Sequence, residues 1–588
     1  MRIRTGLSFI SFLGAALLGL SCGGGSSAPA PVTPPIGVRL SASAVQAVQD
    51  GTPASVDVSI TRPTGTSRSV TLSVASLPAG ASATVESPGA GDTGKVTITT
   101  PSAAAAGTYQ VAIRASDGVS SGSANLTLVV AIMARVGSMT TGRIDMFMST
   151  SFQPASWSDD FFVRHPEATT PLDELLSQHI RLQALERDVP QLDADTWDFT
   201  YLDRIVNPIF TVTDHSPQFQ IALGPEFMYD APQHLRDTTF QEFADYCARL
   251  VEYYNSGGFT DGSGTFHQSS SPWPITYWGV YNEPNINGLS PQEYVNLYNV
   301  VVPAMLSEDP SIKLAAVELA DFSDEPQRYL PTFVSNVTAQ VDVVATHYYS
   351  SCNQQDSDQA VFNTIPGFVD HIDYIYSQLE SKPALANVPV WVTENNVNAD
   401  WSNGGISVCN GTPFVLDTRG SSAFFAAWRP LVFSRLAQAG VRALHHWGFA
   451  ADAQFGEVSG ASGGLYLSYW ADYWLARYFP SPPGSDILEL NSTESATVEI
   501  LPTLRDDGTW VIMLANHAVN ASGDNNGPGA PRTVILDVSA LGPFSSATRL
   551  AIDSGTNLAS GPLEQAITPA DQMEITLNGY GVTFLALR

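Results

Sequence analysis

The chain has 588 residues, of which 44% are hydrophobic and 14% charged, a composition that indicates several folded domains rather than disorder. Its formal net charge of −30 at pH 7 repels polyanions, so we exclude nucleic acid as a partner. No CxxC or HExxH pattern occurs, and we expect neither a metal site nor a cofactor.

The N-terminus has the features of an export signal. Two arginines precede an apolar run from Gly6 to Leu20, which is too short for a comfortable membrane span. Cys22 follows directly and resembles the cleavage and lipidation site of bacterial lipoproteins, although a glycine stands three places before it where leucine is usual. Residues 1–22 are therefore expected to be a lipoprotein-type signal peptide, with ordinary secretion as the alternative. Either way the protein is exported, to the cell surface or outer membrane or to the medium.

A flexible linker and a β-rich module are expected next. Residues 23–36 are rich in Gly, Ser, Ala and Pro, as linkers are. Over residues 37–133 apolar and polar residues alternate, as in Ser55–Ile60, and turn clusters separate the runs. This segment resembles the cysteine-free immunoglobulin-like modules of bacterial surface proteins. We expect a β-sandwich that acts as a spacer, with glycan binding as the alternative role.

Between residues 134 and 480 apolar strands alternate with capped helices, which indicates βα units and a parallel sheet. The run Ser290–Glu293, for example, has the pattern of a capping box. Eight strands can be counted, the number that a closed (β/α)8 TIM barrel needs. The glycine-rich phosphate loop of a doubly wound sheet is missing. The strands are expected within Arg135–Met148, His179–Leu185, Gln218–Leu223, Thr276–Tyr281, Lys313–Leu319, Val341–Thr346, Val388–Thr393 and Ala443–Trp447.

The last part of the chain returns to alternation, as in Ala496–Ile500 and Trp510–Leu514. This pattern predicts a second β-sandwich over residues 481–588, packed on the barrel as a structural module. The expected fold is therefore a multidomain one: a TIM barrel flanked by an N-terminal immunoglobulin-like β-sandwich and a C-terminal β-sandwich.

Two of the expected barrel strands end in a glutamate. The fourth leads into Asn282 and Glu283, and the seventh leads into Glu394. Polar groups at the carboxyl ends of barrel strands line the active site. Hydrolysis of a glycosidic bond needs two carboxylates that face each other over that bond. We therefore predict that Glu283 and Glu394 lie across one sugar.

This arrangement resembles the large clan of retaining (β/α)8 glycoside hydrolases, in which Asn-Glu after strand four is the acid/base and a glutamate after strand seven is the nucleophile. Within the clan, Asn282–Asn285 and Trp197–Asp203 are most similar to glycoside hydrolase family 39. The resemblance covers the barrel and the C-terminal sandwich. It implies a carbohydrate substrate, with Glu283 as acid/base, Glu394 as nucleophile and Asn282 in contact with the 2-hydroxyl of the sugar.

The same resemblance implies roles for further residues. Arg181 matches a basic residue that supports the nucleophile and keeps its pKa low. His347 matches a residue that touches substrate or the acid/base, Tyr349 one that donates to the nucleophile, and Trp447 the aromatic floor of the −1 subsite. His347 and Trp447 are also compatible with packing alone. Glu226 and Glu318 are also near strand ends, but neither is favoured as a subsite residue.

Export makes disulfides possible. Cys352 and Cys409 follow neighbouring barrel strands and should lie in loops at the same end of the barrel, so we expect a disulfide between them. Cys247, within a helix, is then left as a buried thiol.

The predicted function is cleavage of a poly- or oligosaccharide by double displacement. The alternatives are a non-catalytic carbohydrate-binding surface lipoprotein on a degenerate barrel and a transglycosidase, which would use the same two glutamates. The resemblance allows β-xylosides, uronic-acid-containing glycans and exopolysaccharides as substrates, and the few cations in the barrel loops do not favour anionic ones. The sequence decides neither exo against endo action nor the oligomeric state. Contact with a membrane is expected only through the lipid anchor.

Overall fold

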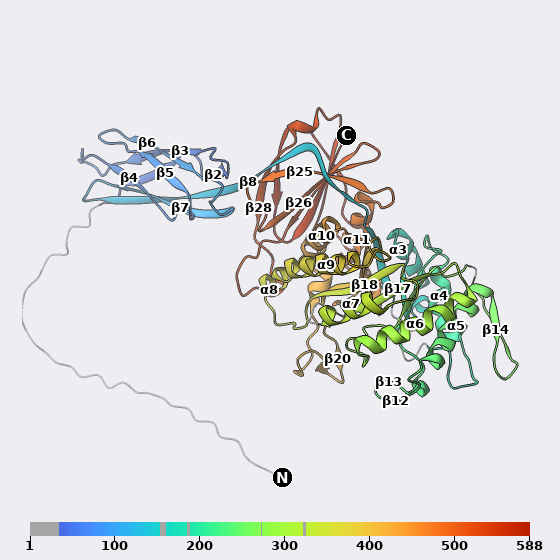
Figure 1. Ribbon diagram of the computed structural model, residues 1–588. Coiled ribbons are helices and arrows are strands. Elements are labelled where there is room, and N and C mark those ends of the chain that lie inside the picture. The colour runs from blue at the N-terminus through green and yellow to red at the C-terminus, as the bar shows by residue number, and fades with distance from the viewer. Residues whose placement is uncertain (1–33, 153–159, 185–188, 272, 321–324) are drawn as a thin grey trace, which may run out of the picture.

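The computed structural model describes residues 34–152, 160–184, 189–271, 273–320 and 325–588. Figure 1 shows a β-rich N-terminal region at one side, a barrel surrounded by helices at the other, and a C-terminal sheet between them. The predicted signal peptide, the lipidation site at Cys22 and nearly all of the predicted linker lie outside the described residues. No helix in the described part of the chain is long and apolar enough to cross a membrane.

The N-terminal region consists of two layers of strands that share one core. The buried residues come from both layers, for example Val56 and Ile98 from one and Ile113 and Leu128 from the other, so the layers pack face to face. Its immunoglobulin-like identity stays a prediction. One layer contains β1 (Gly37–Leu40), β3 (Ala54–Thr61), β6 (Thr93–Thr99) and β5 (Ser82–Glu86), and the other contains β2 (Ala44–Val48), β8 (Ser121–Ile144), β7 (Gly107–Ser116) and β4 (Thr71–Ala75).

Strand β8 continues from this region into the C-terminal sheet. Its second half pairs antiparallel with β25 (Ser485–Ser492), and residues Ile132–Arg135 pair in parallel with β28 (Arg532–Asp537). The prediction of a first barrel strand within Arg135–Met148 was therefore wrong for most of that segment, and β8 crosses the predicted domain boundary at residues 133 and 134. The pattern of alternation shows that a segment is a strand, but it does not show which sheet the strand joins.

The barrel itself is closed by eight parallel strands in the order β10-β11-β16-β17-β18-β19-β22-β9, which confirms the predicted number. Seven of the eight lie where the sequence placed them. Strands β18 and β19 extend several residues beyond their apolar runs, because buried polar residues continue them. The strands are β9 (Phe147–Phe152), β10 (Arg181–Ala184), β11 (Gln218–Ile221), β16 (Tyr277–Val280), β17 (Lys313–Leu319), β18 (Val343–Ser351), β19 (Val390–Asn398) and β22 (Ala443–Trp447).

Helices connect the barrel strands and cover the outside of the barrel (Figure 1). The capping box expected at Ser290 is present: Ser290 Oγ accepts from the backbone N–H of Glu293, and the Glu293 carboxylate accepts from the backbone N–H of Ser290. The helices are α2 (Phe161–Arg164), α3 (Thr169–Glu174), α4 (Thr200–Ile209), α5 (Gln241–Ser256), α6 (Pro291–Glu308), α7 (Glu325–Asn336), α8 (Asp358–Asn363), α9 (Ile365–Glu380), α10 (Ala423–Gln438) and α11 (Leu467–Tyr478).

The C-terminal strands form one continuous path with β8, in the order β30-β29-β32-β27-β26-β25-β8-β28-β31. Residues from both ends of this path share one core, so the sheet curls back on itself. Its other face packs against α10, which is buried almost all round because it lies between the barrel and this sheet. The remaining strands are β26 (Val498–Arg505), β27 (Trp510–Asn516), β29 (Ala547–Asp553), β30 (Gln565–Ile567), β31 (Gln572–Leu577) and β32 (Gly581–Leu587).

Candidate active site

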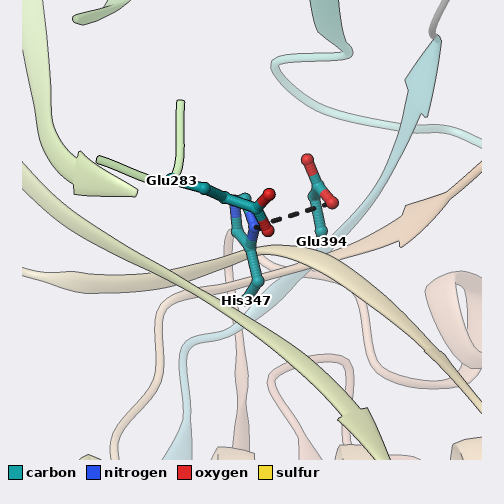
Figure 2. Close-up of side chains that lie close together, drawn as sticks. All are labelled: Glu283, His347 and Glu394. Carbon is teal, nitrogen blue, oxygen red and sulfur yellow. Dashed lines mark hydrogen bonds and ion pairs between the residues drawn. The ribbon is translucent and has the colours of Figure 1, made fainter. Parts of the chain in front are cut away.

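Polar side chains from five barrel strands and the segments that follow them meet at one place. Figure 2 shows Glu283, His347 and Glu394 pointing toward one another. One ligand-type atom from each of these three side chains lies within 4.8 Å of the others, so the two carboxylates approach at least that closely. Arg181, Asn282 and Tyr349 join the same hydrogen-bond network. The structure thus brings the predicted residues together.

Glu283 is positioned by an irregular turn directly after β16. Tyr281 and Glu283 both have left-handed backbones, with φ of 65° and 47°, a conformation that non-glycine residues adopt only when their surroundings impose it. The backbone N–H of Tyr281 donates to Ile221 O at 3.0 Å, and that of Glu283 donates to Glu318 O at 3.0 Å. These bonds fix the turn that aims the Glu283 side chain into the barrel mouth.

Glu394 lies within β19 and receives one donor on each carboxylate oxygen. Arg181 Nη1 donates to Oε1 at 2.8 Å, and Tyr349 Oη donates to Oε2 at 2.7 Å. Burial raises the pKa of Glu394 and the charge of Glu283 adds to this, while His347, Arg181 and Tyr349 act in the opposite direction. The Glu394 side chain is 6% exposed and that of Glu283 is 19% exposed, so Glu283 is the more accessible of the two.

His347 bridges three carboxylates. Its Nδ1 lies 2.8 Å from Glu283 Oε1 and 3.5 Å from Glu394 Oε2, and its Nε2 lies 3.1 Å from Glu318 Oε2. Burial acts to lower the pKa of His347, but Glu394, Glu283 and Glu318 overcome this and raise the pKa to about 9. At neutral pH the ring is therefore an imidazolium, and both nitrogens donate.

Arg181 and Glu318 form a charged layer beneath these groups. Arg181 is fully buried, and its Nη2 donates to Asn282 Oδ1 at 2.8 Å and to Glu318 Oε2 at 3.2 Å. Burial acts to raise the pKa of Glu318, but Arg181 and His347 outweigh it and lower the pKa to about 2. Glu318 is fully buried. Its carboxylate is therefore closed off from solvent and cannot line a substrate subsite.

Trp447, at the end of β22, lies beside Tyr349. It packs with Tyr349 and Phe455 in a small apolar cluster, and its Nε1 donates to Gln183 Oε1 at 3.3 Å. Gln183 also accepts from Arg181 at 3.1 Å. Sequence reasoning missed Gln183, although a signal exists: Arg181 and Gln183 recur at a period of two in an otherwise apolar strand, so both face the inside of the barrel.

A disulfide closes the loops above the site. Cys352 and Cys409 are bonded, with their Cα atoms 5.7 Å apart, and Cys247 is a free, buried thiol in α5. Both predictions about the cysteines are confirmed. The bond ties the segment after β18 to the hairpin of β20 (Ser402–Asn403) and β21 (Ile406–Ser407), which follows β19.

Comparison with known proteins points to one class of enzyme. Residues 250–410 match the family model described as glycosyl hydrolase catalytic core, and this stretch contains Glu283, His347 and Glu394. No curated protein matches the chain.

Solved structures share the fold at low sequence identity. A monomeric β-xylosidase from Caulobacter crescentus CB15 has a TM-score of 0.55 at 16% identity, over 78% of this chain and 99% of that chain. The GH39 enzyme from Xanthomonas axonopodis pv. citri has a TM-score of 0.52 at 15% identity, over 78% and 97%. The GH51 arabinofuranosidase from the same organism has a TM-score of 0.54 at 12% identity, over 78% and 100%. Family 39 is thus one of several glycoside hydrolase families with this fold.

Proposed function

We propose that this glycoside hydrolase retains the configuration at the anomeric carbon, with Glu283 as acid/base and Glu394 as nucleophile. The observation that carries the proposal is the approach of the two carboxylates, whose nearest oxygens lie within 4.8 Å. Retaining enzymes hold their carboxyl groups about 5–5.5 Å apart, whereas inverting enzymes need about 6.5–9.5 Å to admit a water molecule. The short separation favours direct attack by a carboxylate.

The surroundings of the two glutamates support different roles for them. Glu394 accepts from a guanidinium and a phenol, and both bonds favour its ionised form. The charge of Glu283 opposes the ionisation of Glu394, so a proton on Glu283 removes that opposition. The side chain of Glu283 is the more exposed of the two, at 19% against 6%, which suits a group that exchanges protons with the leaving oxygen and with water.

In the first step Glu283 gives its proton to the leaving oxygen while a Glu394 oxygen forms a bond to the anomeric carbon. In the second step Glu283 takes a proton from water, and the oxygen of that water displaces Glu394. Asn282 Oδ1 accepts from Arg181, which leaves the amide N–H₂ to donate to the 2-hydroxyl of the sugar. Trp447 is proposed as the apolar floor under that sugar.

Export and a lipid anchor at Cys22 also belong to the proposal. The disulfide between Cys352 and Cys409 supports export, because such bonds persist in oxidising compartments. Membership of family 39 is supported by the Asn282–Asn285 and Trp197–Asp203 motifs.

A screen of aryl glycosides and polysaccharides, followed by Glu394→Gln, tests the function. Removal of the nucleophile should reduce turnover by at least about 10⁴-fold, and a 2-fluoro sugar should label Glu394 in the wild type. The matched control is Glu226→Gln, an exposed glutamate near the end of another barrel strand. Normal activity of Glu394→Gln, or an inverted first product by ¹H NMR, contradicts the proposal.

A further inference from the structure

We infer that Glu318 is a positioning residue: its buried carboxylate holds His347 with both ring nitrogens as donors, so that the proton of Glu283 stays available to the leaving group. The inference rests on the proposed roles of Glu283 and Glu394. It assigns a task to a carboxylate that is closed off from substrate.

The first support is the number of elements that Glu318 joins. Its carboxylate accepts hydrogen bonds from side chains of four other barrel strands, and its backbone oxygen accepts from the N–H of Glu283 at 3.0 Å. Glu318 thus contacts Glu283 directly, and it reaches Glu394 through one residue, Arg181. The four donors are Gln218 at 3.0 Å, Arg181 at 3.2 Å, His347 at 3.1 Å and Thr393 at 2.6 Å.

The second support is the backbone that aims these groups. β17 carries an extra residue relative to β18 between Ala316 and Leu319, and within this bulge Val317 and Glu318 have φ of 80° and 43°. A left-handed valine persists only where its surroundings impose it. Tyr294 Oη, from α6, accepts from the Val317 N–H at 2.6 Å and so holds the bulge. The strained backbone of this bulge turns the Glu318 side chain toward the inside of the barrel.

A second bulge lies on the other side of β18. β19 carries an extra residue, Thr393, between the partners of Thr346 and His347, and its hydroxyl donates to Glu318. A bulge re-aims the side chains around it. The bulges in β17 and β19 lie on the two sides of β18, the strand that carries His347, and together they bring Glu318 and Thr393 into contact.

The third support is the balance of charges around His347. It faces the carboxylates of Glu283 from the turn after β16, Glu318 from β17 and Glu394 from β19. Arg181 from β10 is the permanent cation in contact with Glu318 and Glu394. Two weaker groups lie near the same carboxylates: the phenol of Tyr349, which donates to Glu394, and His445 on β22, which interacts with Glu318 and whose pKa burial lowers to about 3. Loss of the Glu318 charge therefore removes one of the three carboxylates that keep His347 cationic.

The protonation of His347 decides where the Glu283 proton points. As an imidazolium, His347 donates Nδ1–H to Glu283 and Nε2–H to Glu318, and neither nitrogen can accept. As a neutral ring that keeps Nε2–H, it would offer Nδ1 as an acceptor and bind the Glu283 O–H. The acid proton would then point to His347 and away from the glycosidic oxygen.

The test compares Glu318→Gln with the wild type on two glycosides of one sugar, one with a 2,4-dinitrophenyl and one with a poor, alkyl leaving group. Because protonation of the leaving group is worth about 10²–10⁴-fold only where the leaving group needs it, we expect a loss of about 10²-fold for the alkyl glycoside and a few-fold for the dinitrophenyl glycoside. The basic limb of the kcat/KM profile should move down by about one pH unit or more. An equal loss for both substrates with an unmoved basic limb refutes the inference.

A titration of the His347 ring by ¹⁵N NMR needs no substrate and reads the protonation state of the ring in the wild type. The ring should stay doubly protonated to about pH 9; a ring already neutral at pH 7 overturns the inference. The resonance is assigned by its loss in His347→Asn. Glu318→Asp keeps the charge and should keep a higher His347 pKa than Glu318→Gln, and equal values for both also overturn it. Failure of the catalytic proposal shows separately, as an active Glu394→Gln.

Discussion

Replacement of Tyr349 by phenylalanine removes one hydrogen bond from Glu394 and leaves the aromatic ring in place. The lost bond, of 2.7 Å, joins a phenol to a buried carboxylate, and a bond to a charged group is worth about 1.5–3 kcal/mol. Since one pKa unit corresponds to about 1.4 kcal/mol, the pKa of Glu394 should rise by about one to two units. Removal of a donor from the ionised form destabilises that form, so the pKa shift has a positive sign.

The nucleophile must be ionised, so the acid limb of kcat/KM should move up by the same amount. At a pH on the acid limb, below the pKa of Glu394 in both proteins, Tyr349→Phe should lose about 10–100-fold, and the loss should shrink as the pH rises. The control is Tyr348→Phe, whose hydroxyl lies near Ser350 and Thr364, at 2.7 and 3.0 Å. Its acid limb should not move. An unmoved limb in Tyr349→Phe, or an equal shift in both variants, refutes the assignment of Tyr349 as a partner of the nucleophile.

Two further predictions concern stability. Because the disulfide spans a sequence separation of 57 residues, the double substitution Cys352→Ser with Cys409→Ser should lower the free energy of unfolding by up to about 4 kcal/mol. Calorimetry should give the same melting temperature for this variant and for the reduced wild type, and a melting temperature equal to that of the oxidised wild type contradicts the prediction. The buried ion network should also make stability depend on pH at both ends. The pKa of His347 is raised from 6.5 to about 9, so His347 contributes about 3 kcal/mol to stability below pH 6.5, and this contribution is lost as the pH rises through 9. The pKa of Glu318 is lowered from 4.5 to about 2, so Glu318 contributes a similar amount above pH 4.5, and this contribution is lost as the pH falls through 2. Denaturant unfolding across this range tests both signs, and the alkaline loss should be absent in His347→Asn.

The barrel was predictable because its strands are continuous apolar runs between capped helices. The first strand was not, since Arg135–Ile144 alternates like any half-buried strand and finds its partners about 350 residues later, in β25. No local pattern contains that information. The C-terminal sandwich was predicted from the same kind of alternation, and for the same reason the shared path through β8 could not be anticipated.

The predicted site residues converge because each lies at or beyond the carboxyl end of a parallel strand, or on its inner face. The direction of the Glu318 side chain could not be predicted, for a specific reason. In a regular strand that begins at Lys313, side chains alternate between the two faces of the sheet, so the position of Glu318 would determine its face. The bulge at Val317 adds one residue and changes that alternation. A bulge arises from contacts with neighbouring strands and with Tyr294, so the sequence of β17 alone does not contain it.

Strand β8 gives the molecule a continuous mechanical connection. A force applied to the N-terminal region passes along one backbone to Ile144 and, after two intervening residues, enters β9 of the barrel wall. Strands β25 and β28 are hydrogen-bonded to β8 along the way. A force along β8 therefore shears the hydrogen bonds of both pairings together and does not break them one after another. A truncation at residue 133 would cut through this connection and remove half of the β8 residues that pair with β28.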